Sequence, residues 1–230
     1  MLDETLYRDA RDEFIARVVP GKTFVDVGGL WQITRERVSI ASDSGAISVT
    51  LLDVTPKEDP QWKQFRDHMD RLGIPSYNTI SMDVHQCFDE YDVVHCSGVL
   101  YHTRNPLAFV QALRRITKEH LILTSAVTPT LMSNTAGKME LPHAAWLFLP
   151  GLRGYERNVM RAHWEPWVQN TAIGLTRDVD DWEAEDWAPW YWLPTPSALV
   201  TMCEFAGFRV VNEKYIWNNN ALTLLLRAPE

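Results

Sequence analysis

Cysteine is scarce in this chain of 230 residues, which contains three: Cys87, Cys96 and Cys203. Their odd number and unpaired spacing argue against a disulfide framework and a zinc knuckle. Long apolar runs are also missing, because no segment approaches the roughly 18 residues that a membrane span requires. The first residues show neither the basic region nor the apolar run of a signal peptide. We therefore expect a cytoplasmic protein in a reducing compartment, without a membrane partner.

Acidic residues outnumber basic residues in this chain. The chain has 22 Lys and Arg against 30 Asp and Glu, which gives a formal net charge of -8. Nucleic-acid binding draws on clustered Lys and Arg, so this charge disfavours a polyanionic partner. With 46% apolar residues, a chain of this length buries an ample core. We expect one domain over residues 1–230.

Two phosphate-binding motifs are incomplete. Leu30 stands where G-x-G-x-x-G needs its second glycine, which lets the backbone approach a pyrophosphate. Ala16 replaces the first glycine of a Walker loop that would end at residues 21–23, and the expected strand follows the lysine of that loop instead of preceding it. The sequence therefore argues against both a dinucleotide and a Walker-type phosphate site.

A different nucleoside site is indicated by residues 23–29, TFVDVGG, which read as a buried strand with Asp26 near its end and a turn at Gly28 and Gly29. A second strand ends at Asp53, whose carboxylate suits the hydroxyls of a ribose. The expected cofactor has a ribose, lacks phosphates and carries cationic groups that suit an acidic pocket. S-adenosylmethionine meets these conditions.

Helices and strands alternate along the chain. Apolar residues recur every four positions from Leu2 to Val18, which predicts a helix ended by Pro20. Capping residues followed by proline predict further helix starts at residues 59–60, 105–106 and 195–196, and helix ends are expected at Gly45, Gly73 and Gly207.

Strands rich in β-branched and aromatic residues are expected near residues 23–27, 47–52, 77–81, 91–96, 119–125, 208–216 and 221–227. This alternation predicts an α/β fold with a mostly parallel sheet. The turn-rich residues 217–220 join the last two strands into a closing hairpin, so one antiparallel edge is expected.

The run from Tyr91 to Pro106, YDVVHCSGVLYHTRNP, adds a third set of motifs. Together with the glycine turn, Asp53 and Met82-Asp83, it closely resembles the ordered motifs of class I S-adenosylmethionine-dependent methyltransferases. The resemblance covers residues 20–125 and 190–226. It implies a Rossmann-like, seven-stranded sheet with the last strand inserted antiparallel.

A subgroup resemblance rests on residues 98–102 (GVLYH), 192–199 (WLPTPSAL) and 206–208 (AGF). These are similar to the tRNA wobble-uridine carboxymethyltransferase group. The same motifs recur in methyltransferases that act on small molecules, so the acceptor class stays open.

The superfamily resemblance implies which residues bind the methionine and ribose of the cofactor. Asp26, Gly28 and Gly29 match the motif that holds the methionine end, where glycine admits the backbone and a carboxylate attracts the ammonium group. Asp53 would accept hydrogen bonds from both ribose hydroxyls.

The adenine end is assigned in the same way. Asp83 would receive the adenine amino group, and Met82 would pack near the ring. Gly98 and Val99 follow the fourth strand and would pass under the cofactor.

His102 is the catalytic candidate, because it lies past the carboxyl end of the fourth strand, where open α/β sheets place ligands. A neutral imidazole there accepts a proton near pH 7. Two roles remain open: a general base, or an anchor that orients the loop. His143 and His163 are alternative acceptor-site histidines.

Residues 127–192 are expected to form an insertion that covers the substrate. It contains seven of the ten Trp residues: Trp146, Trp164, Trp167, Trp182, Trp187, Trp190 and Trp192. Most of these rings are explained by a small core or by an interface between copies of the chain in a homo-oligomer. Tyr101, Tyr191 and Trp192 are the expected substrate contacts, with His143 and His163.

No metal site is expected. The acidic run from Asp178 to Asp186 is interrupted by Trp182 and reads as a solvated face. His85 and Cys87 lack further ligands at a useful spacing for zinc.

The sequence thus predicts a methyltransferase that modifies oxygen or nitrogen on a small molecule. Two alternatives stay open: a tRNA-modifying methyl- or carboxymethyltransferase, and a cofactor-binding subunit without catalysis.

Overall fold

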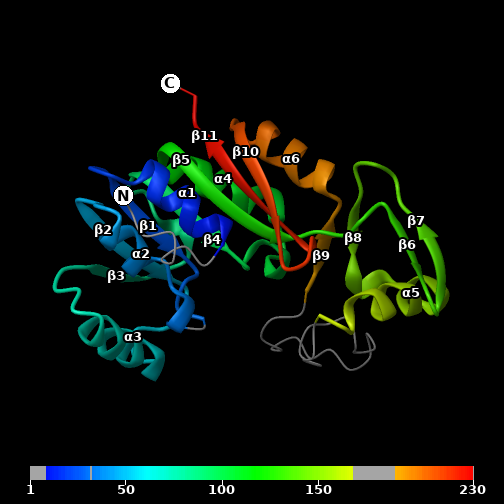
Figure 1. Ribbon diagram of the computed structural model, residues 1–230, viewed down its shortest axis with the longest axis horizontal. Coiled ribbons are helices and arrows are strands. Elements are labelled where there is room, and N and C mark those ends of the chain that lie inside the picture. Colours follow the sequence, from blue (N-terminus) through cyan, green and yellow to red (C-terminus); the bar gives the residue numbers. More distant parts are fainter. Residues whose placement is uncertain (1–8, 32, 168–189, 230) are drawn as a thin grey trace.

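The computed structural model describes residues 9–31, 33–167 and 190–229 of the chain. A seven-stranded sheet in the order β10-β11-β5-β4-β1-β2-β3 forms its centre (Figure 1). Its strands are β1 (Thr23–Val27), β2 (Ser48–Asp53), β3 (Asn78–Ser81), β4 (Tyr91–Ser97), β5 (Thr117–Ala126), β10 (Arg209–Ile216) and β11 (Ala221–Arg227). β11 pairs antiparallel with both β10 and β5, and the other pairs are parallel. The predicted α/β sheet with one inserted antiparallel strand is confirmed.

The strand order reverses between β1 and β4. The chain runs outward through β2 and β3 and then returns to the other side of β1 to form β4. The chain leaves β1 toward α2 (Val38–Asp43) and leaves β4 toward α4 (Pro106–Ile116), on opposite faces of the sheet, and α/β sheets bind ligands at the carboxyl ends of strands at such a reversal. The glycine turn, Asp53, Asp83 and the loop containing His102 all follow strands at this edge.

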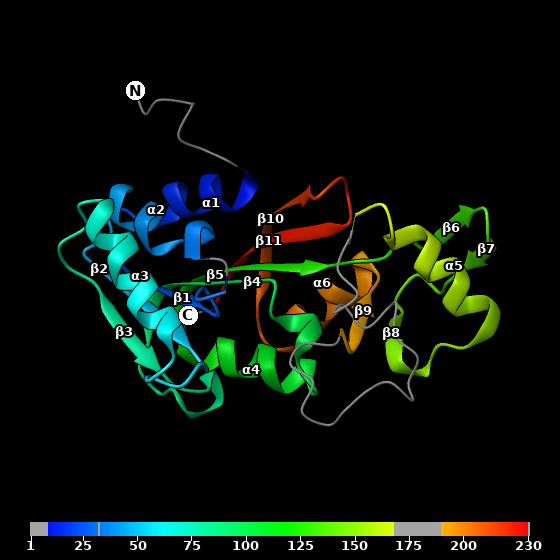
Figure 2. The same cartoon turned by 90° about the horizontal axis from the view of Figure 1, so that it is seen from below.

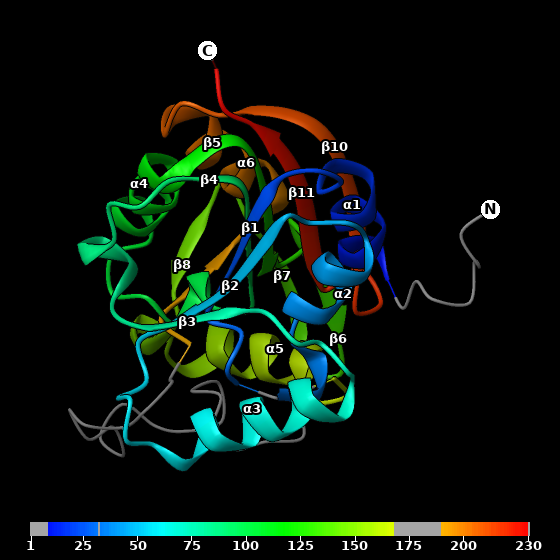
Figure 3. The same ribbon diagram turned by 90° about the vertical axis from the view of Figure 1, so that its left-hand side faces the viewer.

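Helices cover both faces of the sheet. α1 (Ala10–Val18), α2 (Val38–Asp43) and α3 (Pro60–Arg71) lie on one face, and α4 (Pro106–Ile116) and α6 (Pro196–Phe205) lie on the other (Figure 3). Phe14, Phe24 and Trp62 belong to the core on the first side, and Val94, Leu113 and Leu199 belong to the core on the second.

The predicted helix signals match the structure, with two differences. The first helix, predicted from Leu2, begins at Ala10 with Asp9 as its cap, and residues 1–8 lie outside the described residues. Asp59 and Asn105 accept backbone N–H groups at the starts of α3 and α4, as expected for capping residues. Thr195 does not cap α6 with its side chain, because its hydroxyl donates to the carbonyl of His143 and accepts the N–H of Ala145. These two hydrogen bonds connect the start of α6 to residues 143–145 of the insertion.

The insertion forms a small unit of its own beyond the carboxyl end of β5 (Figure 2). It contains two antiparallel pairs, β6 (Leu131–Asn134) with β7 (Gly137–Glu140) and β8 (Trp146–Phe148) with β9 (Trp192–Pro194). α5 (Gly154–Trp164) packs on β6 and β7. A third core joins this unit to Tyr101, in the loop after β4, and to Ala126 at the end of β5.

None of the helices in the described ranges has the length and apolar character needed to cross a bilayer.

Candidate cofactor and acceptor site

The turn after β1 needs its two glycines for different reasons. Gly28 has a φ of +80°, a left-handed conformation that glycine adopts without steric cost, and a side chain there would overlap with Val99 from the loop after β4. A side chain on Gly29 would overlap with the Asp26 carboxylate. The loops after β1 and β4 therefore touch, and the turn folds closely over Asp26.

Asp26 is 1% exposed and both of its oxygens are engaged. Oδ1 lies 2.7 Å from Nδ1 of His95 in β4, and Oδ2 accepts the backbone N–H of Arg37 at 3.0 Å. Burial alone would raise the pKa of Asp26, but His95 and Arg37 outweigh it and hold the pKa below its usual value. Each oxygen keeps a second lone pair, but because Asp26 is buried, a cofactor ammonium group would reach it only if the turn over it moved.

Asp53 sits at the tip of β2 in a fixed orientation. Its Oδ1 accepts the backbone N–H and the hydroxyl of Thr55, at 2.9 and 2.7 Å, and its Oδ2 accepts the N–H of Leu30 at 3.1 Å. A carboxylate has about four acceptor positions, so roughly one remains, on Oδ2. With Thr55 in this position, Asp53 suits one ribose hydroxyl better than the expected two.

Asp83 follows β3 and is about half exposed. Its Oδ1 accepts the N–H of His85 and lies 2.7 Å from the His85 ring, while Oδ2 has no hydrogen-bond partner among the described residues. Met82, beside it, is 37% exposed, and its N–H donates to the carbonyl of Asp53 at 2.8 Å. One oxygen of Asp83 is thus available at the edge where the adenine amino group is expected.

The loop after β4 brings Gly98, Tyr101 and His102 together. Gly98 has a φ of +79°, and a side chain on it would meet the Tyr101 hydroxyl at 3.4 Å. A short helix, η4 (Leu100–His102), follows, in which the His102 N–H donates to the carbonyl of Val99. The His102 ring lies 4.5 Å from the Tyr101 ring between centroids and is partly exposed. Burial raises the pKa of Tyr101, so its hydroxyl stays protonated.

Aromatic rings continue from this loop into the insertion. Trp190 lies 4.6 Å from Tyr101 between ring centroids, and Trp164 lies 5.0 Å from Trp190 in an edge-on arrangement. All three rings are buried. Trp146 packs against the core under α4 and α6. These Trp residues serve packing, as expected for most of the set, while Trp182 and Trp187 lie outside the described residues.

The other predicted acceptor-site residues separate into two groups. Tyr191 donates its backbone N–H to the carbonyl of Tyr101, and Trp192 Nε1 donates to the carbonyl of Arg104, so both lie against the loop after β4. His163 lies on α5 with Nε2 3.3 Å from Oδ1 of Asn220 in the turn before β11. His143 is exposed in the connection between β7 and β8.

The environment of His163 favours its neutral form. Burial lowers its pKa, against the opposing effect of its contact with Asn220. If Nε2–H donates to Asn220, as the contact to an amide oxygen indicates, Nδ1 is the acceptor nitrogen.

Two residues of this edge were missed by the sequence analysis. His95 reads as an ordinary strand residue, yet it is the partner of Asp26, and its Nε2 is buried without a hydrogen-bond partner among the described residues. Arg11 belongs to the N-terminal helix, where the periodicity marked only the apolar positions, yet its guanidinium donates to Ser97 Oγ at the end of β4. Neither contact has a local sequence signal, because each joins segments far apart in the chain.

The described residues contain no group of three or more His, Cys, Asp or Glu side chains arranged to hold a metal ion. The acidic run at 178–186 lies outside them.

Comparisons with known proteins agree with this arrangement. A family model described as a methyltransferase domain matches residues 3–213. No curated protein matches the chain by sequence.

Three solved structures are similar to the chain. The magnesium protoporphyrin IX methyltransferase ChlM from Synechocystis PCC 6803, with bound SAH, has a TM-score of 0.60 and 14% identity, covering 95% of this chain and 82% of that chain. The mitomycin 7-O-methyltransferase MmcR has a TM-score of 0.57 and 12% identity, covering 95% and 53%. The [4+2]-cyclase SpnF has a TM-score of 0.56 and 13% identity, covering 95% and 79%.

At such identities, structural similarity establishes the fold. The family model spans most of the chain, and the glycine turn and the loop containing His102 lie at the switch point between β1 and β4. The chain therefore belongs to the methyltransferase domain family and is an S-adenosylmethionine-dependent methyltransferase.

Proposed function

We propose that the protein methylates an oxygen or nitrogen atom of a small molecule. Two partly exposed rings, Tyr191 and Trp192, carry this proposal. They lie against the loop after β4, at the edge where an acceptor must approach, beside the buried aromatic series of Tyr101, Trp190 and Trp164. Such rings supply stiff contact area for planar ligands. The net charge of -8 favours such an acceptor over a polyanion. Two structural neighbours carry names that specify small-molecule methyl acceptors.

The described residues fit the cofactor at the switch point. Gly28 and Gly98 have positive φ values and no side chains, so a ligand can approach the backbone closely at both positions. Asp53 retains an acceptor position for a ribose hydroxyl, and Asp83 Oδ2 is available for the adenine amino group. In this proposal Val99 and Met82 pack along the nucleoside, while Asp26 and Gly29 hold the turn beneath the methionine end.

When bound, the cofactor supplies a methyl group activated by a sulfonium sulfur. The chain must then align the acceptor atom, exclude water and, for a hydroxyl acceptor, take up a proton. In our proposal the insertion at residues 127–192 covers the acceptor, and Tyr191 and Trp192 line it beside Tyr101. His102 takes the proton, with His163 as the second candidate on the opposite side of the aromatic series.

Asp53→Ala is expected to weaken cofactor binding by about 1 to 3 kcal/mol, because a charge-assisted hydrogen bond to the ribose is lost. Calorimetry with S-adenosylhomocysteine measures this directly. The same ligand is expected to raise the melting temperature of the wild type by mass action, whereas NAD and ATP have little effect. Unchanged affinity in the variant would remove Asp53 from the site.

Thr55→Val provides a matched variant for this measurement. It removes the hydroxyl that donates to Asp53 Oδ1 at 2.7 Å and leaves the carboxylate in place. The freed acceptor position is expected to maintain or improve nucleoside binding. A loss as large as that of Asp53→Ala would indicate that the two residues act only by shaping the loop.

A tRNA acceptor is the second candidate, favoured by the motifs at residues 98–102 and 192–199. Binding of tRNA would depend steeply on salt, because each neutralised phosphate releases counterions. We expect no binding of bulk tRNA tighter than about 10 μM near physiological salt, measured by filter binding. Tighter binding that weakens steeply as salt rises would favour the tRNA candidate over the small molecule.

A further inference from the structure

Trp217 begins the turn between β10 and β11. β10 runs in the same direction as β5, because both pair antiparallel with β11, so this turn lies at the edge where β4 and β5 also end. The backbone carbonyl of Asn220, the last residue of the turn, accepts the N–H of Val127, and Asn220 Oδ1 lies 3.3 Å from His163 Nε2. The turn therefore contacts the insertion beside the second candidate for the proton acceptor.

The backbone of this turn has an unusual conformation. Trp217, Asn218 and Asn219 have φ values of +51°, +53° and +67°. Asparagine adopts this left-handed region more readily than most residues, whereas the region is costly for a bulky residue such as Trp. Strained residues of this kind persist where the surrounding structure holds them, and they often occur at ligand sites. The presence of Trp at position 217 therefore calls for an explanation beyond the turn itself.

Burial gives only part of that explanation. Trp217 is 40% exposed, so much of the hydrophobic stabilisation that a Trp side chain can provide is missing. Arg11 Cζ lies 5.9 Å from the centroid of the ring, near the outer limit of a cation–π interaction. Arg11 is itself held by hydrogen bonds to Asp9 and Ser97. The indole thus rests on a fixed guanidinium and keeps an exposed surface.

Arg11 also relates the position of this ring to the switch point. Its Nη1 donates to Ser97 Oγ at 2.9 Å, and Ser97 is the last residue of β4. The end of β4 and the Trp217 ring therefore contact the same guanidinium. A ligand that stacks on the indole would lie next to the edge where the proposed function places methyl transfer.

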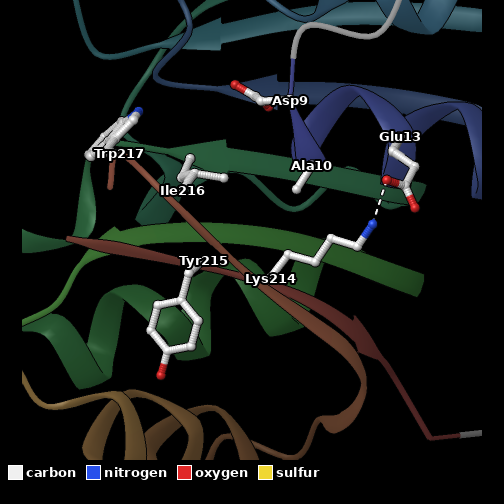
Figure 4. Close-up of a pocket in the computed structure, with 7 residues that line it drawn as sticks. All are labelled: Asp9, Ala10, Glu13, Lys214, Tyr215, Ile216 and Trp217. Atoms are coloured by element: carbon white, nitrogen blue, oxygen red, sulfur yellow. Dashed lines mark hydrogen bonds and ion pairs between the residues drawn. The ribbon is translucent and has the colours of Figure 1, made fainter. Parts of the chain in front are cut away.

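A groove open to solvent borders the ring, between the start of α1 and the end of β10 (Figure 4). Its volume of about 520 Å³ is within the range of small-molecule sites. Trp217 lies at one end and the ion pair of Glu13 with Lys214 at the other, with Ala10 and Ile216 between them (Figure 4). The indole thus forms one end wall of a space large enough for a ring system.

The charges in this groove are balanced. In the part of the chain that the structure describes, its charged lining residues are paired, Asp9 with Arg11 and Glu13 with Lys214. A charged ligand would have to compete with these ion pairs, whereas an uncharged aromatic ring can stack on the indole without disturbing them. The groove therefore favours an uncharged, planar ligand.

We propose that this groove binds a planar aromatic ring system of the methyl acceptor, stacked on Trp217. The inference rests on the proposed function, methylation of a small molecule, and it narrows the acceptor class to uncharged, planar aromatic compounds. It adds the turn between β10 and β11 to an acceptor site that otherwise comprises the loop after β4 and the insertion. A Trp ring suits this role because it offers a large, stiff face at little cost in conformational entropy.

2-Naphthol tests ring binding without turnover, in the presence of saturating S-adenosylhomocysteine. In protein with isotope-labelled tryptophan, the indole N–H signal of Trp217 is identified as the one that Trp217→Asn removes, and 2-naphthol is expected to shift it. Decahydro-2-naphthol has the same skeleton and hydroxyl but no aromatic face, and it is expected to bind more weakly. By calorimetry, Trp217→Asn is expected to weaken 2-naphthol binding about 3- to 10-fold, as for a lost aromatic pair.

Two further variants separate the ring from general effects of substitution. Trp217→Phe retains a smaller ring and is expected to keep most of the affinity. Phe88→Asn is the matched control, because Phe88 is 74% exposed and its ring centroid lies 4.7 Å from Arg115 Cζ in the connection before β4. It is expected to leave 2-naphthol binding unchanged. Asparagine suits the left-handed conformation at position 217, so the melting temperature of Trp217→Asn is expected to stay within about 4 °C of the wild type.

An unshifted Trp217 signal, or equal affinity of the wild type and Trp217→Asn for 2-naphthol, would overturn the ring-binding groove. On an acceptor identified with the wild type, Trp217→Asn is expected to raise KM about 3- to 10-fold and leave kcat nearly unchanged, because the ring contributes to binding alone. An unchanged KM would overturn the assignment of the groove to the acceptor. The proposed function fails separately, if the wild type methylates no small molecule with S-adenosylmethionine.

Discussion

Asp26→Ala is expected to lower the free energy of unfolding by about 3 to 5 kcal/mol, as when one partner of a buried charged pair is removed. The carboxylate is 1% exposed and accepts from His95 Nδ1 and the N–H of Arg37. Alanine would leave both donors buried without a partner. Urea unfolding followed by circular dichroism measures the loss.

The partner of Asp26 gives an internal check on this prediction. When His95→Phe is added to Asp26→Ala, it is expected to lower the free energy of unfolding much less than it does in the wild type. The Nδ1–H group that Asp26→Ala leaves without a partner is removed together with the histidine. Asp67→Ala on α3 is the control, since its ion pair with Lys63 is exposed and its loss is expected to leave stability unchanged. Additive effects of the Asp26 and His95 changes would contradict a coupled pair.

The stability provided by Asp26 also depends on pH. Its pKa is lowered in the folded protein, so the unfolded chain takes up a proton first as pH falls. The contribution is full above the unfolded pKa of about 4 and is lost as pH falls through the folded value. The stability difference between the wild type and Asp26→Ala is therefore expected to narrow below about pH 4.

The sheet was predictable because its signals are local. β-branched runs marked the strands, and Asp59 and Asn105, each followed by proline, marked helix starts. The antiparallel insertion of the last strand followed from the family resemblance together with the closing turn at 217–220. The strands inside the insertion gave no comparable signal, because each has three or four residues and β8 pairs with the distant β9.

The contacts of the site residues were less predictable. The sequence indicated that Asp26 and Gly29 matter, but the reason inferred for both was the cofactor. In the structure, Gly29 is required by the Asp26 carboxylate beneath it, and Asp26 is engaged by His95. That pairing depends on the register of β1 against β4, which aligns Asp26 with His95. A single sequence contains no direct record of register between strands so far apart.

Asp53 illustrates the same limit at the level of hydrogen bonds. Its place at a strand tip was predictable, but the occupation of three acceptor positions by Thr55 and Leu30 was not. Arg11 belongs to no sequence motif, because it reaches this edge of the sheet through tertiary contacts such as the one with Ser97. The strands and helices of this chain can thus be predicted from local sequence patterns. The hydrogen bonds of its site residues cannot, because they join segments that are far apart in the sequence.

His102→Ala is expected to lower turnover by about a hundredfold or more on an acceptor identified with the wild type, because positioned proton transfer contributes that much. Cofactor affinity, measured by calorimetry, is expected to stay nearly intact. The backbone N–H of His102 donates to Val99 and is unaffected by the substitution. The substitution removes the proton acceptor and the ring contact with Tyr101.

His102→Phe separates these two losses. Phenylalanine retains a ring against Tyr101, 4.5 Å away in the wild type, but accepts no proton. If His102 is a general base, both variants are expected to lose turnover equally. If it only anchors the loop, His102→Phe is expected to retain the turnover, stability and cofactor affinity that His102→Ala loses. His163→Gln, on the other side of the aromatic series, tests the second histidine. If turnover falls in this variant and persists in both His102 variants, proton transfer belongs to His163, whose lowered pKa keeps the ring neutral and so able to accept a proton.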